Sequence, residues 1–385
     1  MILIKNGRVL TMAGEPIENG QVLVENGKIT AVGENLKAPE GCRVLDAGGG
    51  YIMPGIIDAH CHAGLVEDGI GFEGMDENEA TDPVTPQLRA IDAINPHDRS
   101  LREAYESGIT CICTGPGSAN VIGGTFVVIK TKGERVDNMI VKDPAAMKIA
   151  FGENPKRVYS SKKQSPSTRM ATAAILRENL FKAVEYRNSK LKAEEEGKDA
   201  PSFNFKLESL IPVLEHKIPL KAHAHRTDDI FTAIRIAREF NLDITLDHCT
   251  EGHLIAEELA KEGLPAIVGP SFGHRTKIEV QEKSFETAGV LVRAGMKIAL
   301  MTDHPVIPLN YLPMCAGYAV KAGLDEKAAF EAITKNPAEI LGIADRVGTL
   351  EKGKDADIAV FDGNPLEIKS RAKYVLINGE IVFEA

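Results

Sequence analysis

The chain has 385 residues, of which 43% are hydrophobic and 26% are charged, as in folded proteins with a large core. Its formal net charge of −10 excludes a general electrostatic attraction to nucleic acids or anionic membranes. The six cysteines include no Cys-x-x-Cys pair, and the N-terminus lacks the pattern of a secretory signal. No apolar run approaches the roughly 18 residues that cross a bilayer. These features predict a cytoplasmic protein.

Both ends of the chain have the pattern of short β-strands joined by tight turns. Asn6-Gly7, Asn26-Gly27 and Asn378-Gly379 each lie between apolar runs, and Asn-Gly supplies the positive φ angles of a two-residue hairpin turn. Isolated hairpins are only marginally stable, so the two ends are expected to fold together. The sequence predicts one small β-sandwich domain built from residues 1–52 plus 344–385.

Residues 53–343 alternate short apolar strands with longer helical stretches. The expected strands lie at 55–59, 109–113, 126–129, 147–151, 219–222, 243–246, 266–268 and 297–300. The expected helices include 228–240, 253–262, 281–294 and a long one at 167–196 with a charged, solvated end. Repeated strand-then-helix order implies a parallel sheet, and eight such strands favour closure. The fold class is therefore α/β, a (β/α)8 TIM barrel carrying the small β-sandwich.

Histidines and one aspartate follow the expected strands. His60 and His62 end the first barrel strand, and residues two apart on a strand share a face. His223 and His225 follow the fifth strand, His248 the sixth and Asp303 the eighth. The C-terminal strand ends of a barrel meet at one face, so these groups are expected to share a pocket.

The sequence resembles the amidohydrolase superfamily along essentially its whole length. Residues 54–62 read PGIIDAHCH and look like the first-strand signature of that superfamily, and Met301-Thr302-Asp303 resembles its eighth-strand aspartate. Residues 347–357, VGTLEKGKDAD, resemble the return to the sandwich domain. The resemblance is greatest to imidazolonepropionase-related and prolidase-like members.

This resemblance implies a divalent metal site and a set of ligands. It places them at His60, His62, His223, His248 and Asp303, with an acidic group or a carboxylated lysine from the fourth strand. Mixed imidazole and carboxylate ligands suit one or two zinc ions, with manganese or iron as alternatives. Asp303 would also act as general acid and base for a metal-activated water.

Two ligand positions have alternatives. Glu153 lies at the end of the fourth strand, where the pocket is expected, and is preferred to Lys148, which is interpreted as structural. His223 fits the fifth-strand ligand position better than His225, which is then expected to contact substrate. His274, after the seventh strand, and Tyr159 and Arg169, after the fourth, are the other candidate substrate-binding residues, the last two for a carboxylate.

Three functions are compatible with these residues. The first is hydrolysis of a carbon–nitrogen bond in a cyclic amide, N-acyl compound or small peptide. The second is deamination of a ring, which is disfavoured because residues 223–229 (HAHRTDD) contain no glutamate for proton transfer. The third is a catalytically silent scaffold, which would be expected to lose ligands. The sequence fixes neither the substrate nor the number of metals, and it leaves a homo-oligomer open.

Overall fold

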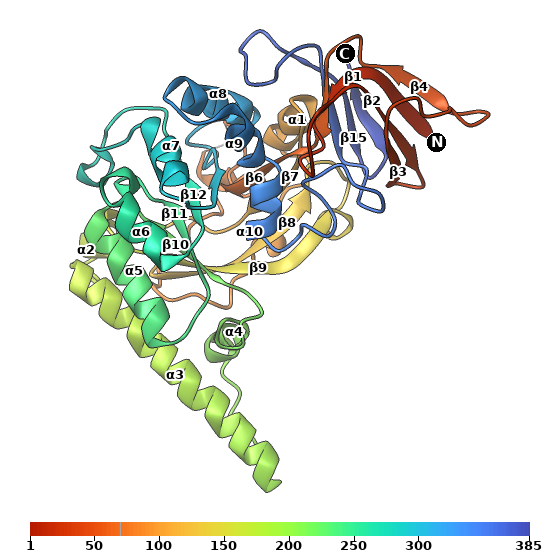
Figure 1. The fold of residues 1–385 in the computed structure, drawn as a ribbon. Coiled ribbons are helices and arrows are strands. Elements are labelled where there is room, and N and C mark those ends of the chain that lie inside the picture. Colours follow the sequence, from red (N-terminus) through yellow and green to blue (C-terminus); the bar gives the residue numbers. More distant parts are fainter. Residues whose placement is uncertain (70) are drawn as a thin grey trace.

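The computed structural model describes residues 1–69 and 71–385. Two sheets organise the chain, one built from both termini and one that curves into a nearly closed barrel (Figure 1). Both termini lie in the terminal sheet (Figure 1). None of the helices in the described ranges combines the length and the apolar character needed to cross a bilayer.

The terminal sheet has eight strands in the order β16-β15-β14-β5-β1-β2-β3, with β4 also paired to β1. Its strands form one continuous hydrogen-bonded network, and buried residues of these strands share one apolar cluster, which fits the expected small β-domain built from both termini. β5 passes the expected domain limit at residue 52, because Met53 and Pro54 pair with Ala359 and Ile358. Its strands are β1 (Ile2–Val9), β2 (Ile17–Glu25), β3 (Lys28–Gly33), β4 (Arg43–Asp46), β5 (Tyr51–Pro54), β14 (Ile358–Phe361), β15 (Ala372–Ile377) and β16 (Glu380–Glu384).

The barrel sheet has its eight strands in chain order. They are β6 (Ile56–Cys61), β7 (Ile109–Thr114), β8 (Ile122–Lys130), β9 (Ile140–Ala150), β10 (Leu220–Ala224), β11 (Ile244–His248), β12 (Ala266–Val268) and β13 (Ile298–Leu300). All eight expected strands are therefore present. Asp58 connects the first barrel strand, β6, to the segment that follows the last one, β13. Its Oδ2 accepts hydrogen bonds from the backbone N and the Oγ1 of Thr302.

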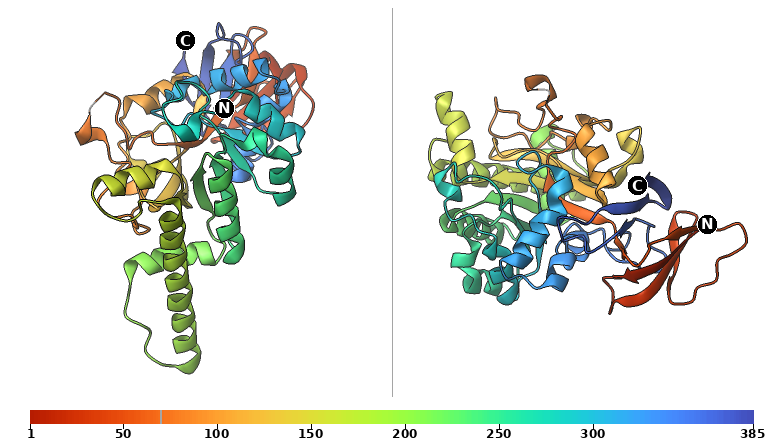
Figure 2. Two further views of the ribbon diagram at one scale, coloured as in Figure 1. Left: turned by 90° about the vertical axis from the view of Figure 1, so that its left-hand side faces the viewer. Right: turned by 90° about the horizontal axis from the view of Figure 1, so that it is seen from above.

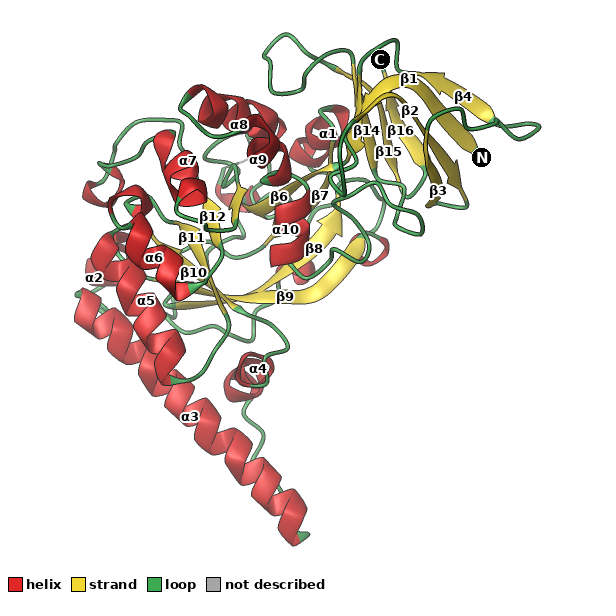
Figure 3. Ribbon diagram, in the orientation of Figure 1, coloured by secondary structure: helices red, strands yellow, loops and turns green. Residues whose placement is uncertain are grey.

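The expectation of eight parallel strands is wrong for one of them. β8 runs antiparallel to both β7 and β9 (Figure 3). The physical reason is the length of the connections: residues 115–121 and 131–139 are shorter than the roughly dozen residues that a parallel crossover needs. β8 therefore begins at the end of the barrel where its neighbours finish, which brings Gly123 and Gly124 to that rim.

Helices cover the barrel from β9 onward. The long α3 extends far beyond the sheet, and α4 packs beside it (Figures 1 and 2). α3 begins with Thr168 as its N-cap, whose Oγ1 accepts from Ala171 N, and ends at Gly197 in a left-handed conformation. The helices are α1 (Arg99–Glu106), α2 (Glu153–Ser161), α3 (Arg169–Glu196), α4 (Phe205–Leu214), α5 (Thr227–Glu239), α6 (Ala256–Glu262), α7 (Glu286–Arg293), α8 (Leu312–Lys321), α9 (Glu326–Glu331) and α10 (Lys335–Ile340).

Candidate metal and substrate site

Two groups of three side chains gather where the parallel barrel strands end. His60, His62 and Asp303 form the first, and His223, His225 and His248 the second. Within each group, ligand atoms from all three side chains lie within 4.8 Å of one another. The structure thus brings these residues from separate strands to one rim of the barrel, as expected. Each group could hold a metal ion.

Neighbouring acceptors fix which ring nitrogens of the first group face the pocket. Nδ1 of His60 lies 2.5 Å from Oδ2 of Asp247, and Nδ1 of His62 lies 2.7 Å from the carbonyl oxygen of Gly115. Carboxylate and carbonyl oxygens only accept, so each Nδ1 carries the proton and each Nε2 presents a lone pair. Those two Nε2 atoms lie 3.5 and 3.3 Å from Oδ1 of Asp303.

The second group is arranged in the same way. Nδ1 of His248 lies 2.9 Å from the carbonyl oxygen of Gly269, which leaves a lone pair on Nε2. That Nε2 lies 2.8 Å from Nδ1 of His223. His225 stacks on His248 with ring centroids 4.5 Å apart, and its Nδ1 lies 2.7 Å from Thr250 Oγ1. Nδ1 of His223 therefore donates a hydrogen bond to Nε2 of His248, and the two rings meet at one place in the site.

Burial lowers the pKa values of His60, His223, His225 and His248, which favours the neutral imidazole that binds metal. Burial, together with the charge of Lys148, holds the pKa of His60 well below its ordinary value. Burial lowers the pKa values of His223 and His248 in the same direction, and lowers the pKa of His225 to about 3.

Each of the two groups contains one residue with a strained backbone conformation. His248 has φ 73° and Asp303 has φ 54°, which are uncommon angles for residues other than glycine. The turn at His248 lets Asp247 and His248 both face the barrel interior, although consecutive strand residues normally face opposite ways. Sequence alternation alone therefore missed Asp247, which supports His60.

Lys148 lies between the two groups. It is fully buried, its Nζ is 3.4 Å from Nε2 of His60, and it lines the same cavity as His223 and Asp303. Burial lowers its pKa to about 8, with the charge of Asp247 opposing this effect. Gly123 leaves room for it, because a Cβ there would lie 3.3 Å from its Cγ. A lysine is rarely buried without a specific reason. The position of Lys148 between the apolar residues Met147 and Ile149 was therefore the feature of the sequence that could have identified it as a site residue.

Glu153, expected as the fourth-strand ligand, is not brought to either group. It is the first residue of α2, and its Oε1 accepts a hydrogen bond from Glu279 N at 3.1 Å. Its own N donates to Glu279 Oε2 at 2.7 Å. β9 ends at Ala150 and the chain turns at Gly152 (φ 80°), so an argument from regular strand alternation does not reach residue 153.

Three expected substrate residues also lie away from the cavity lining. The Tyr159 hydroxyl donates to the Asp82 carbonyl oxygen at 2.7 Å. Arg169 pairs with Asp229 through Nε at 2.9 Å, and His274 is exposed. His225 is the one expected substrate residue that lines the cavity.

The cavity at this rim has a volume of about 310 Å³. Gly117 and Ser118, from the segment between β7 and β8, line it. The rest of the wall combines charged and polar side chains with apolar ones. The charged and polar residues are His62, Glu77, Asn78, Lys148, Asn154, His223, His225, Thr276, Lys277, Lys283 and Asp303, and the apolar ones are Pro270, Val280, Pro305 and Val306.

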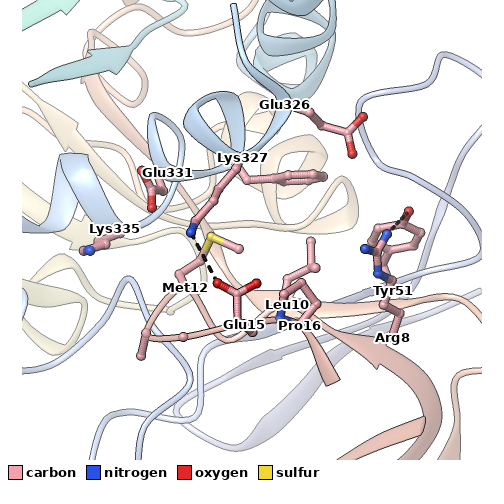
Figure 4. Close-up of a pocket in the computed structure, with 13 residues that line it drawn as sticks. Arg8, Leu10, Met12, Glu15, Pro16, Tyr51, Glu326, Lys327, Glu331 and Lys335 are labelled. Carbon is pink, nitrogen blue, oxygen red and sulfur yellow. Dashed lines mark hydrogen bonds and ion pairs between the residues drawn. The ribbon is translucent and has the colours of Figure 1, made fainter. Parts of the chain in front are cut away.

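A second cavity, also of about 310 Å³, lies between the N-terminal loop and α9 and α10 (Figure 4). Leu10, Met12 and Tyr51 contribute apolar surface, and an ion pair of 3.9 Å joins Lys327 to Glu15 across it. None of the described residues that line this cavity is a histidine, cysteine or aspartate. The two three-residue groups that could hold a metal ion lie at the barrel rim.

A barrel with paired histidines and an aspartate at its strand ends defines a hydrolase of the metal-dependent barrel class. The amidohydrolase family profile matches residues 51–382, and the chain belongs to this family. It is a hydrolase that acts on carbon–nitrogen bonds, and enzymes of this family are generally metal-dependent.

Individual relatives agree with this assignment. The crystal structure of an amidohydrolase from Thermotoga maritima MSB8 is 45% identical, has a TM-score of 0.97 and covers all of both chains. Amidohydrolase tasK of Hapsidospora irregularis is 30% identical over 95% of this chain, which spans only 40% of that relative. An imidazolonepropionase from Mesorhizobium japonicum is 25% identical, with 98% of this chain and 96% of that protein covered.

Proposed function

We propose that the barrel rim hydrolyses a small amide, either an N-acyl compound, a small peptide or a cyclic amide. The observation that carries this proposal is the facing pair of three-residue groups, with Lys148 between them. We propose His60, His62 and Asp303 as ligands of one divalent ion and His223 and His248 as ligands of a second, with zinc as the first choice and manganese or iron as alternatives.

Lys148 replaces Glu153 in this proposal as the fourth-strand ligand. A neutral amine can attack CO₂, forming an N–C bond and releasing one proton, and the product is a carboxylate with two oxygens. Nζ of Lys148 lies 3.4 Å from Nε2 of His60, and Lys148 lines the same cavity as His223, so those oxygens would lie near both groups. Its pKa of about 8 leaves a useful fraction of neutral amine near neutral pH.

A bound divalent ion would lower the pKa of water and polarise a carbonyl group. Asp303 would orient the attacking water, accept its proton and pass that proton to the departing nitrogen as the carbon–nitrogen bond breaks. Its side chain is 14% exposed, and its Oδ1 faces His60 and His62, so it can contact both a ligand site and substrate. His225 lines the cavity beside the second group, where it would contact the substrate.

The test combines metal analysis with a substrate screen. The purified protein, reconstituted separately with zinc, manganese and iron, should bind about one or two ions per chain. A panel of dipeptides, N-acyl amino acids and cyclic amides is then screened for amine or ring-opened product. Asp303→Asn should keep the fold and lower turnover about 10²- to 10⁴-fold, the range of general acid–base catalysis. A protein that binds no metal at this rim would refute the proposal.

A second candidate function, ring deamination, is favoured by one contact. Glu279, which lies far from residues 223–229 in the sequence, places Oε1 3.9 Å from Nε2 of His225. The tertiary structure thus supplies a glutamate next to this histidine, where the local sequence offered none. Burial raises the pKa of Glu279, which suits a group that holds a proton. Release of ammonia from ring amines, without amide cleavage, would favour this function.

A further inference from the structure

One loop supplies much of the open side of the cavity. Residues 269–285 connect β12 to α7, and Pro270, Thr276, Lys277, Val280 and Lys283 from this loop line the cavity. The loop therefore supplies part of the surface that a ligand in the cavity would contact. None of its lining residues belongs to the two three-residue groups below.

The loop is braced at several places. Glu153 and Glu279 exchange two hydrogen bonds between side chain and backbone. Arg275 donates from Nε to the carbonyl oxygen of Gln281 at 2.7 Å and from Nη2 to that of Lys283 at 2.9 Å. Side chains on this loop are therefore held in defined positions, which reduces the entropy cost of contacting a ligand.

Phe272 and Phe285 add an apolar brace at the ends of this loop. Their ring centroids lie 4.8 and 5.1 Å, respectively, from that of Tyr318 on α8. This aromatic cluster packs the loop against a helix outside the barrel. Lys277 and Lys283 therefore lie in a loop segment that is anchored by aromatic packing on both sides.

Two of the loop side chains are cations turned toward the cavity. Lys277 Nζ donates to Asn154 Oδ1 at 2.6 Å and lies 3.6 Å from Oε1 of the buried Glu279. That Oε1 accepts no hydrogen bond from the described residues, so Glu279 is free to orient Lys277. The ammonium group of Lys277 retains further donors for a ligand.

Lys283 is the less satisfied cation. Its Nζ donates to the carbonyl oxygen of Phe272 at 3.1 Å, and within the described ranges no carboxylate lies within 4.0 Å of it. It is half-buried, and burial lowers its pKa. A half-buried ammonium without a charged partner gains from an anion more than an exposed one does.

The charges of the wall favour an anionic ligand. The charged side chains that line the cavity are three lysines, Lys148, Lys277 and Lys283, and two carboxylates, Glu77 and Asp303, which leaves an excess of one positive charge. Divalent ions would add to it. Neutral donors from Asn78, Ser118 and Thr276 line the same wall. A cavity of about 310 Å³ is at the small end of ligand pockets, so the anion must belong to a compact molecule.

We infer that Lys277 and Lys283 form a carboxylate-binding subsite, so that the substrate is a small amide with a free carboxylate near the scissile carbon–nitrogen bond. This inference rests on the proposed function for the position of the reacting bond. It assigns the carboxylate to the β12–α7 loop, whereas the sequence suggested Tyr159 and Arg169. Lys277 and Lys283 are specificity-determining residues, and Glu279 is a positioning residue for Lys277.

The test compares acids with their uncharged counterparts. Binding of a series of N-acetyl-L-amino acids, and of the corresponding carboxamides, to the metal-loaded full chain is measured by calorimetry. At least one acid should bind about tenfold or more tightly than its carboxamide. Lys283→Met and Lys277→Met should each remove most of this preference, while Lys283→Arg should retain it. Lys261→Met is the matched control, because Lys261 is an exposed lysine paired with Glu258 on α6.

The outcomes separate the two proposals. Hydrolysis of the same compounds is followed in parallel, and Lys283→Met should raise KM for the acids with little change in kcat for the carboxamides. A lysine-dependent preference for acids without cleavage of any compound would support the subsite and refute amide hydrolysis. Cleavage with equal binding of acids and carboxamides, or a preference that survives Lys277→Met/Lys283→Met, would overturn the subsite. Failure of every acid to bind would overturn it as well.

Discussion

The contact between His60 and Asp247 gives the most specific prediction about the site. Asp247 is fully buried, and its Oδ2 lies 2.5 Å from Nδ1 of His60 and 3.0 Å from Nζ of the buried Lys221. Its Oδ1 accepts from Thr245 Oγ1 at 2.9 Å. This one carboxylate therefore fixes the ring of a proposed metal ligand and also balances a buried cation.

Replacing Asp247 with Asn removes the charge and preserves the shape. Lys221 keeps a hydrogen bond to the carbonyl oxygen of Ala59 at 3.0 Å but loses its counter-ion. Breaking a buried ion pair on one side costs about 3–5 kcal/mol, and we expect the lower end because the amide oxygen still accepts. Loss of a carboxylate behind a ligating histidine should weaken metal binding about 10- to 100-fold.

Two measurements separate these effects. Urea unfolding of the metal-free protein reports the first, and competition with a chromogenic chelator reports the second. The double variant Asp247→Asn/Lys221→Met removes the unpaired cation, so it should recover much of the stability without recovering metal affinity. Wild-type metal affinity in Asp247→Asn would refute the role given to this carboxylate. An unchanged unfolding midpoint would refute the ion-pair argument.

Three further predictions concern other parts of the molecule. Lys148→Met should lower the metal content of the reconstituted protein and abolish a CO₂ adduct seen by intact mass spectrometry; unchanged metal stoichiometry would exclude Lys148 as a ligand. Glu153→Ala should leave metal content unchanged, while the loss of one hydrogen bond costs about 1 kcal/mol, measured by urea unfolding; loss of metal would reinstate Glu153. At acid pH the stabilising contribution of Asp355 should disappear. Burial opposes the lowering of its pKa from 3.8, but the hydrogen bond from Lys28 and the charges of Lys130 and Arg346 outweigh it. The contribution is therefore complete above the unfolded value of about 3.8 and is lost as pH falls through the lower folded value. Asp355→Asn should be less stable at neutral pH and lose less stability on acidification, whereas parallel pH profiles would contradict this account.

Much of the fold follows from local patterns in the sequence. Apolar runs of strand length, separated by amphipathic stretches, place all eight barrel strands. Asn26-Gly27 and Asn378-Gly379 form the expected hairpin turns between β2 and β3 and between β15 and β16, whereas Asn6-Gly7 lies within β1, where the pairing with β2 is irregular. The direction of β8 was also within reach, because residues 115–121 are too few for a parallel crossover. The strand pairing within the terminal sheet could not be predicted from the sequence. β1 pairs with β2, β4 and β5 at different points along its length, and local sequence does not specify such long-range pairings.

By itself, the sequence determined the histidine pairs and Asp303, because spacing along a strand and position at its end depend only on backbone periodicity. Only the tertiary structure decided which other groups join them. Asp247 faces the site because its neighbour His248 has a positive φ. Lys148 faces the site because of its position in β9. Glu279, Lys277 and Lys283 belong to the β12–α7 loop, which lies next to the site although it is distant in sequence from most of the other groups. Their roles depend on contacts across the barrel, and local periodicity carries no information about distance through space.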